Sequence, residues 1–140
     1  MILDSGPLIA GLNAKDRHHH LSVRVLRSTS GRAVVPDPVV IEVETTIRRW
    51  YGATMAHVFL DTIRAGAHVR MPLTDALWHR AVEIDRAYAD LNLGLVDTSV
   101  MAVAEAHGEP VFTFDFRAFR GVPGPDNGAW PLVMTEADLA

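Results

Sequence analysis

The chain has 140 residues, about half of them apolar, with a net charge of −4, seven histidines and no cysteine. This length predicts one domain over residues 1–140 with a hydrophobic core of its own. The lack of cysteine excludes a disulfide scaffold, a thiolate zinc site and a cysteine nucleophile. No signal-peptide pattern or apolar run of about 18 residues is present, so we expect a cytoplasmic protein that makes no membrane contact. The net acidity argues against holding nucleic acid by charge alone, unless a metal ion reverses the local field.

Strand-like and helix-like patterns alternate in the first half of the chain. The run that ends at Leu3 is β-like, and Pro7 fits the first turn of a short helix because a missing N–H is tolerated there. Residues 12–20 are polar and predict a loop. Asp37 is expected to cap a long helix with Pro38 in its first turn. In chain order we expect a strand at residues 1–3, helices at 5–13 and 20–31, a strand at 32–36, and helices at 38–50 and 53–66.

The second half continues this alternation. Thr74 and Asp75 begin a long helical pattern, and Asn92 with Gly94 marks the turn before the next one. Strands separated by such helices predict βαβ units, and hence an α/β fold with a mainly parallel sheet flanked by helices. Ligands bind such sheets at the carboxyl ends of the strands. The expected elements are a strand at 67–71, helices at 75–91 and 95–108, a strand at 109–115, a loop at 121–128 and a last strand at 130–134.

Four of the 17 acidic residues stand in apolar sequence. They are Asp4 after "MIL", Glu42 within "VVIEV", Asp97 after "LGLV" and Asp115 after "VFTF". A buried carboxylate is unfavourable unless a hydrogen bond, a cation or a metal compensates it. Parallel topology brings these positions to one edge of the sheet, where carboxylates without a cation would raise one another's pKa. Mg²⁺ or Mn²⁺ resolves this repulsion through oxygen ligands, and such a site suits phosphodiester hydrolysis.

Three of these acids also have a purely structural interpretation. Asp4, or Ser5 after it, could cap the helix that follows the first strand. Asp97 could cap its own helix, and Asp115 could open the turn after the last long strand. Each of these roles leaves a carboxylate oxygen available for a metal.

Glu42 cannot be explained by capping because it lies inside a helical pattern, in a segment that we expect to be largely buried. Arg49 lies seven residues further on the same helical face, so a core salt bridge between the two is the alternative. Glu44 points about 200° away from Glu42 around the helix and therefore cannot serve the same pocket.

Three stretches taken in order resemble the successive motifs of PIN-domain ribonucleases, in particular the VapC-type toxins of bacterial toxin–antitoxin pairs. They read "MILDSGPLIAGL", "VVPDPVVIEV" and "LGLVDTSVMAVAEAHGEPVFTFDFRAF", and the resemblance runs from Met1 to about Phe119. It implies a PIN fold, endoribonuclease activity dependent on Mg²⁺ or Mn²⁺, a homodimer, and a small antitoxin that plugs the acidic groove. It also implies that the catalytic and metal-binding acids are Asp4, Glu42, Asp97 and Asp115, with Ser5 and Thr113 as supporting hydroxyls.

Several basic and aromatic residues are weaker candidates. Arg17, Arg49 and Arg117 are candidates for contacts with RNA phosphates, and for each the alternative is a solvated surface role. Trp50 and Tyr51 are expected to pack in the core or in a dimer contact, with base stacking as the alternative.

The run of histidines at residues 18–20 invites a metal-site interpretation. Adjacent helical residues point about 100° apart, so three in a row cannot chelate one ion from a regular helix. We expect a solvated junction between loop and helix there. For the whole chain, the alternative function is a catalytically silent PIN-like module that binds RNA or an antitoxin, although the presence of all four acids argues against it.

Overall fold

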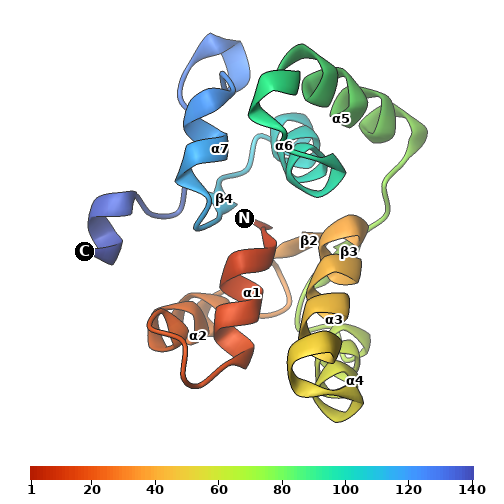
Figure 1. Cartoon of the computed structure of the whole chain (residues 1–140), viewed down its shortest axis with the longest axis vertical. Helices are drawn as coiled ribbons and strands as arrows, with labels where there is room; N and C mark the ends of the chain where they lie inside the picture. The colour runs from red at the N-terminus through yellow and green to blue at the C-terminus, as the bar shows by residue number, and fades with distance from the viewer.

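Four short parallel strands form the centre of the computed structural model, which describes residues 1–140 (Figure 1). Ile2 lies opposite Val34 on one side and opposite Val111 on the other. The strand expected at residues 130–134 is reduced to an isolated parallel bridge between Leu132 and Val111. The strands are β1 (Ile2–Leu3), β2 (Val34–Pro36), β3 (Val69–Met71) and β4 (Val111–Phe112), in the order β3-β2-β1-β4. The predicted α/β fold with a parallel sheet is confirmed.

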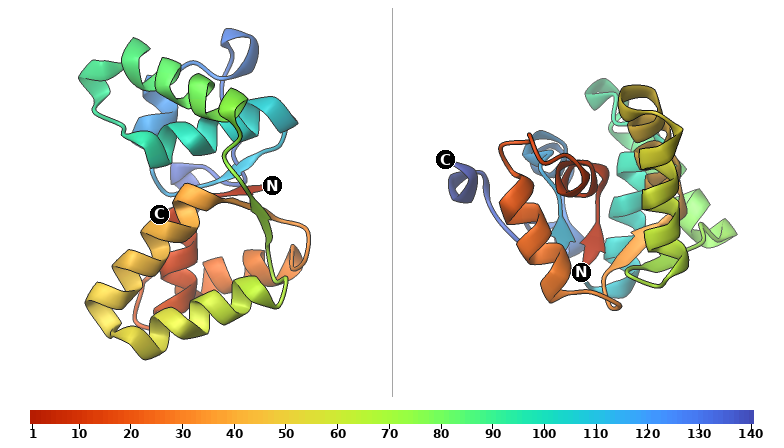
Figure 2. Two further views of the ribbon diagram at one scale, coloured as in Figure 1. Left: turned by 90° about the vertical axis from the view of Figure 1, so that its right-hand side faces the viewer. Right: turned by 90° about the horizontal axis from the view of Figure 1, so that it is seen from below.

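Seven α-helices connect and cover the strands. Because β1, β2 and β3 follow one another in one direction across the sheet, right-handed crossovers place α1 to α4 on one face. The return from β3 to β4 places α5 and α6 on the other face, and Figures 1 and 2 show this division. The helices are α1 (Ser5–Leu12), α2 (His19–Ser28), α3 (Asp37–Tyr51), α4 (Ala53–Arg64), α5 (Asp75–Ala87), α6 (Leu95–His107) and α7 (Phe116–Gly121), with short 3₁₀ helices η1 (Ala89–Leu91), η2 (Pro125–Asn127) and η3 (Glu136–Leu139).

The core forms between the two helical layers. Strands β1 and β4 are fully buried, as expected for strands that are covered on both faces. Helix α6 is buried from Thr98 to Ala104, and its sequence there has no continuous polar face. Val39, Val43 and Ile47 recur every four residues and form the buried stripe of α3. The sheet edge that follows β1 and β4 is therefore held by rigid elements.

The C-terminal segment packs closely around Trp130. The indole Nε1 of Trp130 donates a hydrogen bond to the carbonyl of Val122 at 2.9 Å, and the ring lies edge-on to Phe119 with centroids 5.6 Å apart. A Cβ at Gly124 would lie 2.8 Å from the backbone nitrogen of Trp130. Only glycine fits at this close approach of two backbones.

One local prediction is wrong, and a second is narrowed to one of its two alternatives. Asp37 does not cap α3: it is the first helical residue, Pro36 occupies the cap position, and the Asp37 carboxylate pairs with Arg70 at 3.3 Å. Trp50 is 60% exposed, and Tyr51 is exposed beside it, because both lie in the last turn of α3 beyond the packed part of the helix. This excludes the core alternative for both residues, and a dimer contact stays a prediction. No helix in the structure combines the length and apolarity that a membrane crossing requires.

Candidate active site

The topology creates a switch point between β1 and β4. The chain leaves β1 toward β2 on one side, whereas β4 joins β1 from the other side after crossing the opposite face. Asp4 follows β1 directly, and its backbone N–H donates to the carbonyl of Phe112 in β4 at 3.0 Å. Residues Thr113 and Asp115 follow β4 at the same edge. This is the position at which open α/β sheets bind ligands.

Asp4 lies at the centre of the site and is only 5% exposed. One carboxylate oxygen caps α1 by accepting the Ser5 N–H at 2.7 Å, and the other accepts the Thr113 hydroxyl at 2.6 Å. The Thr113 hydroxyl in turn accepts the Asp115 N–H at 2.9 Å, so it links both acids. Burial raises the pKa of Asp4, and the two hydrogen bonds oppose this rise. The capping interpretation of Asp4 is confirmed, and the same carboxylate lies close enough to Glu42 and Asp115 for their charges to raise its pKa further.

Glu42 reaches the site from the second turn of α3. The Ser5 hydroxyl donates a hydrogen bond to its carboxylate, which links α3 to the start of α1. The expected burial of this segment is wrong: Glu42 and Ile41 are exposed, Ile41 to 66%. Glu42 forms no ion pair with Arg49, whereas Glu44 pairs with Arg48 at 2.5 Å on another side of the helix. The predicted separation of Glu42 and Glu44 is therefore seen in their contacts.

Asp97 and Asp115 complete the group. Asp97 is the third residue of α6, and Gly94 occupies the cap position, so Asp97 is not an N-cap. Burial, followed by the charges of the other three acids, raises the pKa of Asp97 to about 7. Asp115 does cap α7 by accepting the Ala118 N–H at 3.1 Å. Glu42 and Asp97 therefore accept no backbone N–H, and Asp4 and Asp115 each use only one oxygen for capping.

The electrostatics of the site favour a cation. Each ion pair in the structure involves other acids, so no arginine, lysine or histidine neutralises Asp4, Glu42, Asp97 or Asp115. Their mutual repulsion contributes to the raised pKa of both Asp4 and Asp97. Carboxylate oxygens are the ligands that Mg²⁺ and Mn²⁺ prefer, so the donor chemistry and charge fit a divalent ion. No three of the acidic or histidine side chains already surround a single ion position.

The other candidate residues lie around this group rather than in it. Arg17 donates from Nε to His18 at 2.9 Å, and the His18 ring stacks on Phe114 with centroids 5.0 Å apart. The His19 ring bonds the Ala10 carbonyl at 2.9 Å, so the histidines contact different partners. The expected solvated junction is only partly solvated. Its histidines contact α1 through the Ala10 carbonyl and the segment after β4 through Phe114.

Arg49 and Arg117 are the two other arginines predicted to contact RNA phosphates. Arg49 is exposed in the last turns of α3 and forms no ion pair. Arg117 is exposed at the start of α7 and lines a small cleft together with Asp97 and Asp115. Asn92 lines the same cleft. The sequence indicated only that Asn92 belongs to a turn with Gly94, and did not mark it as a candidate site residue.

Comparisons with known proteins agree with this architecture. A sequence model of the PIN domain matches residues 1–125, and a search of curated protein sequences gave no match. VapC20 of Mycobacterium tuberculosis, described as a sarcin–ricin loop cleaving toxin, is 24% identical with a TM-score of 0.73 over 84% of this chain and 92% of that chain. A toxin–antitoxin complex from Klebsiella pneumoniae is 16% identical with a TM-score of 0.65, over 95% of this chain and 98% of that chain. VapBC2 of Rickettsia felis, bound to a promoter DNA fragment, is 13% identical with a TM-score of 0.66, over 91% of this chain and 94% of that chain.

Proposed function

This chain belongs to the PIN-domain family, and from that premise we propose that it is a metal-dependent endoribonuclease toxin of a type II toxin–antitoxin module. The observation that carries this proposal is the convergence of four carboxylates without a cation at the switch point of the sheet. The solved structures with similar folds include a toxin that cleaves the sarcin–ricin loop and several toxin–antitoxin complexes. They support an RNA substrate and an antitoxin partner for this chain.

The chain's own residues hold the site in place. Asp4, Glu42, Asp97 and Asp115 are the residues that would hold Mg²⁺ or Mn²⁺. A bound divalent ion supplies positive charge against a phosphate, lowers the pKa of coordinated water and stabilises the leaving 3′ oxygen. The Thr113 hydroxyl donates to the Asp4 carboxylate and accepts the backbone N–H of Asp115, and the Ser5 hydroxyl donates to the Glu42 carboxylate. Loss of either hydroxyl would free a carboxylate to rotate away from the phosphate.

The acids also determine how RNA is admitted. Without a metal, their negative charge repels a phosphodiester, so binding of metal and substrate is coupled. One of the carboxylates accepts a proton from the attacking water, which approaches the phosphorus in line with the leaving oxygen. Arg117 lines a cleft together with Asp97 and Asp115, and we propose Arg117 and the exposed Arg17 and Arg49 as contacts for the RNA backbone.

An antitoxin and a second copy of the chain are the proposed protein partners. The antitoxin would occupy the acidic groove and block substrate entry, and the similar toxin–antitoxin complexes support such a partner. The exposed Trp50 and Tyr51, set edge-on to each other, are candidates for the homodimer contact. Size measurement of the wild type and of Trp50→Ala, by light scattering at equal concentration, tests that assignment.

The sharpest test of the nuclease site compares two glutamates of one helix. Glu42→Gln should lose at least about 100-fold in RNA cleavage, because a site carboxylate is neutralised. Glu44→Gln changes the same side chain two residues away, where only a surface pair with Arg48 is lost, and should cleave like the wild type. Cleavage is followed on purified cellular RNA with Mg²⁺, and the new ends are sequenced. Equal activity of the two variants would refute the site, and an inactive wild type that still binds RNA would favour the silent binding module.

A further inference from the structure

A small cleft of about 60 Å³ opens beside the acid group, between η1 and α7. Asp97 and Asp115 form the wall that it shares with the proposed site, and Asn92 and Arg117 stand on the other sides. Besides the two acids, the lining includes the side chains of Asn92 and Arg117, which carry N–H donors. Its donors and its place next to the acids therefore suggest an anionic ligand group that belongs to the same substrate.

Arg117 is the only cationic residue that lines this cleft. Its side chain is exposed and forms no ion pair, although two carboxylates line the same cleft. It is also the second residue of α7, where a positive charge interacts unfavourably with the helix dipole. Arg117 thus contributes nothing evident to the stability of the fold, and its planar group of N–H donors is available for an anion.

Asn92 provides a second polar group at the rim. Its backbone is left-handed, with φ 51° and ψ 51°, and its N–H closes η1 by bonding the Ala89 carbonyl at 3.1 Å. Asparagine and glycine are the residues that tolerate this conformation, and of the two only asparagine brings a side-chain amide. The amide can donate to an anion without any change of the backbone.

Leu91 of η1 contacts Gly121 of α7, which brings these two elements together beside the cleft. A Cβ added at Gly121 would lie 2.6 Å from Cδ1 of Leu91, so the Leu91 side chain occupies space that only a glycine leaves open. Leu91 immediately precedes Asn92 and also lines the cleft. The contact between Leu91 and Gly121 therefore positions the elements that carry Asn92 and Arg117, while these two residues stay exposed.

We propose that Arg117 and Asn92 form a subsite for the non-bridging oxygens of a phosphate next to the one that is cut. This inference rests on the proposed ribonuclease function and specifies how the strand is positioned in it. The subsite shares Asp97 and Asp115 with the acid group, so a phosphate bound there belongs to the same strand as the scissile one. Arg117 offsets the repulsion that these acids exert on that second phosphate.

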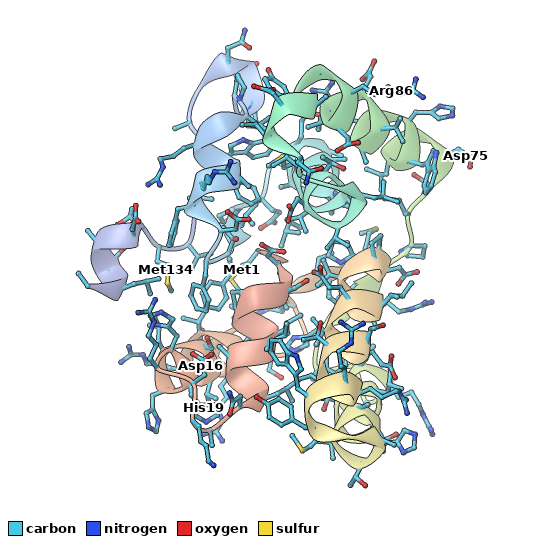
Figure 3. All side chains as sticks on the ribbon, in the orientation of Figure 1. Met1, Asp16, His19, Asp75, Arg86 and Met134 are labelled. Carbon is cyan, nitrogen blue, oxygen red and sulfur yellow. The ribbon has the colours of Figure 1, made fainter.

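The test combines changes in the protein with changes in single phosphates. An oligoribonucleotide that the wild type cuts is prepared with one neutral methylphosphonate at each linkage in turn. Arg117→Gln removes the charge, Asn92→Gly keeps the backbone without the amide, and Asn92→Asp adds a repelling charge. Arg86→Gln is the matched control: this arginine is exposed on α5, forms no ion pair, and points outward far from the centre of the molecule (Figure 3).

We expect Arg117→Gln to lower kcat/KM about tenfold, the loss of one charged hydrogen-bonding group, with most of the effect in KM. One methylphosphonate beside the cut should lower wild-type cleavage similarly and have no further effect in Arg117→Gln. Asn92→Asp should lose more than Asn92→Gly, and Arg86→Gln should match the wild type. The subsite would be overturned if every methylphosphonate lowered cleavage by the same factor in Arg117→Gln as in the wild type. Equal losses of activity in Arg117→Gln and Arg86→Gln would also overturn it.

A binding measurement separates this inference from the proposed function. The anisotropy of a fluorescent mixed-sequence oligoribonucleotide is titrated with Glu42→Gln protein in Mg²⁺, with and without the Arg117→Gln change. Weaker binding caused by Arg117→Gln but not by Arg86→Gln would support the phosphate subsite even if the wild type cut no RNA, in which case only the nuclease proposal would fail. Binding that is unchanged by Arg117→Gln would overturn the subsite even if the wild type is an active ribonuclease.

Discussion

Replacing Asp97 with asparagine is expected to stabilise the metal-free protein near neutral pH. Burial and the neighbouring acids raise the folded-state pKa of Asp97 to about 7, whereas the ordinary value is 3.8. Between these values the folded state retains a proton that the unfolded state has lost, so the stability of the wild type falls as pH rises through this window. Above the window both states are ionised and the full penalty remains. Asparagine resembles the protonated acid and carries no such penalty.

The size of the effect follows from the pKa. The gap between 3.8 and about 7 corresponds to about 4 kcal/mol at about 1.36 kcal/mol per pKa unit. Because the carboxylate is only partly buried, solvent screening reduces this by about half. We therefore expect Asp97→Asn to raise the free energy of unfolding by about 2 kcal/mol near pH 8 and by about 1 kcal/mol or less near pH 5.

Urea denaturation of both proteins in EDTA at the two pH values measures this difference. Asp61→Asn is the control, because Asp61 is exposed on α4 and lies 3.8 Å from Arg64, so its loss should change stability by less than about 0.5 kcal/mol at either pH. A gain for Asp97→Asn that is the same at both pH values, or a loss of stability near pH 8, would refute the raised pKa of Asp97 on which this reasoning depends.

Three other outcomes are expected. Thr113→Val should lower the free energy of unfolding by about 1–3 kcal/mol, since Asp4 and a backbone N–H lose their partner; an unchanged urea midpoint would contradict this. Gly124→Ala should lower it by about 1–3 kcal/mol, and Gly121→Ala by less, because Gly124 faces rigid backbone whereas Gly121 faces the movable end of a side chain; equal losses would contradict the contrast. Mn²⁺ should raise the wild-type Tm more than that of Asp115→Asn, and the absence of a shift in both proteins would count against a metal site.

The strands β1 to β4, the helices α1 to α6 and the grouping of the acids were predictable because they depend on local patterns and on topology, whereas α7 was expected only as a turn. Apolar runs followed by an acid located Asp4 and Asp115, and the rule for parallel sheets brought them together. The capping role of Asp4 was also predictable, because the next residues begin a helix. These inferences need only the chain direction and the end of each strand.

Exposure was the property that the sequence could not supply. Glu42 lies in an apolar run, yet Glu42 and its neighbour Ile41 are exposed, because the buried stripe of α3 is formed by Val39, Val43 and Ile47. Trp50 is apolar, but it lies beyond the last packed turn. Asn92 and Arg117 come from elements 25 residues apart in sequence, and only the packing of η1 on α7 makes them neighbours of one cleft.

The most direct test of the central claim is RNA cleavage by wild type and Asp97→Asn, each with Mg²⁺ or with EDTA. Asp97 takes part in the site through burial and charge, with no hydrogen bond that its replacement would break. We predict that the wild type cuts RNA only with the metal, and that Asp97→Asn remains folded, is at least as stable, and does not cut. Cleavage by folded Asp97→Asn at the wild-type rate, or wild-type cleavage that persists in EDTA, would contradict a metal-dependent site built from these four acids.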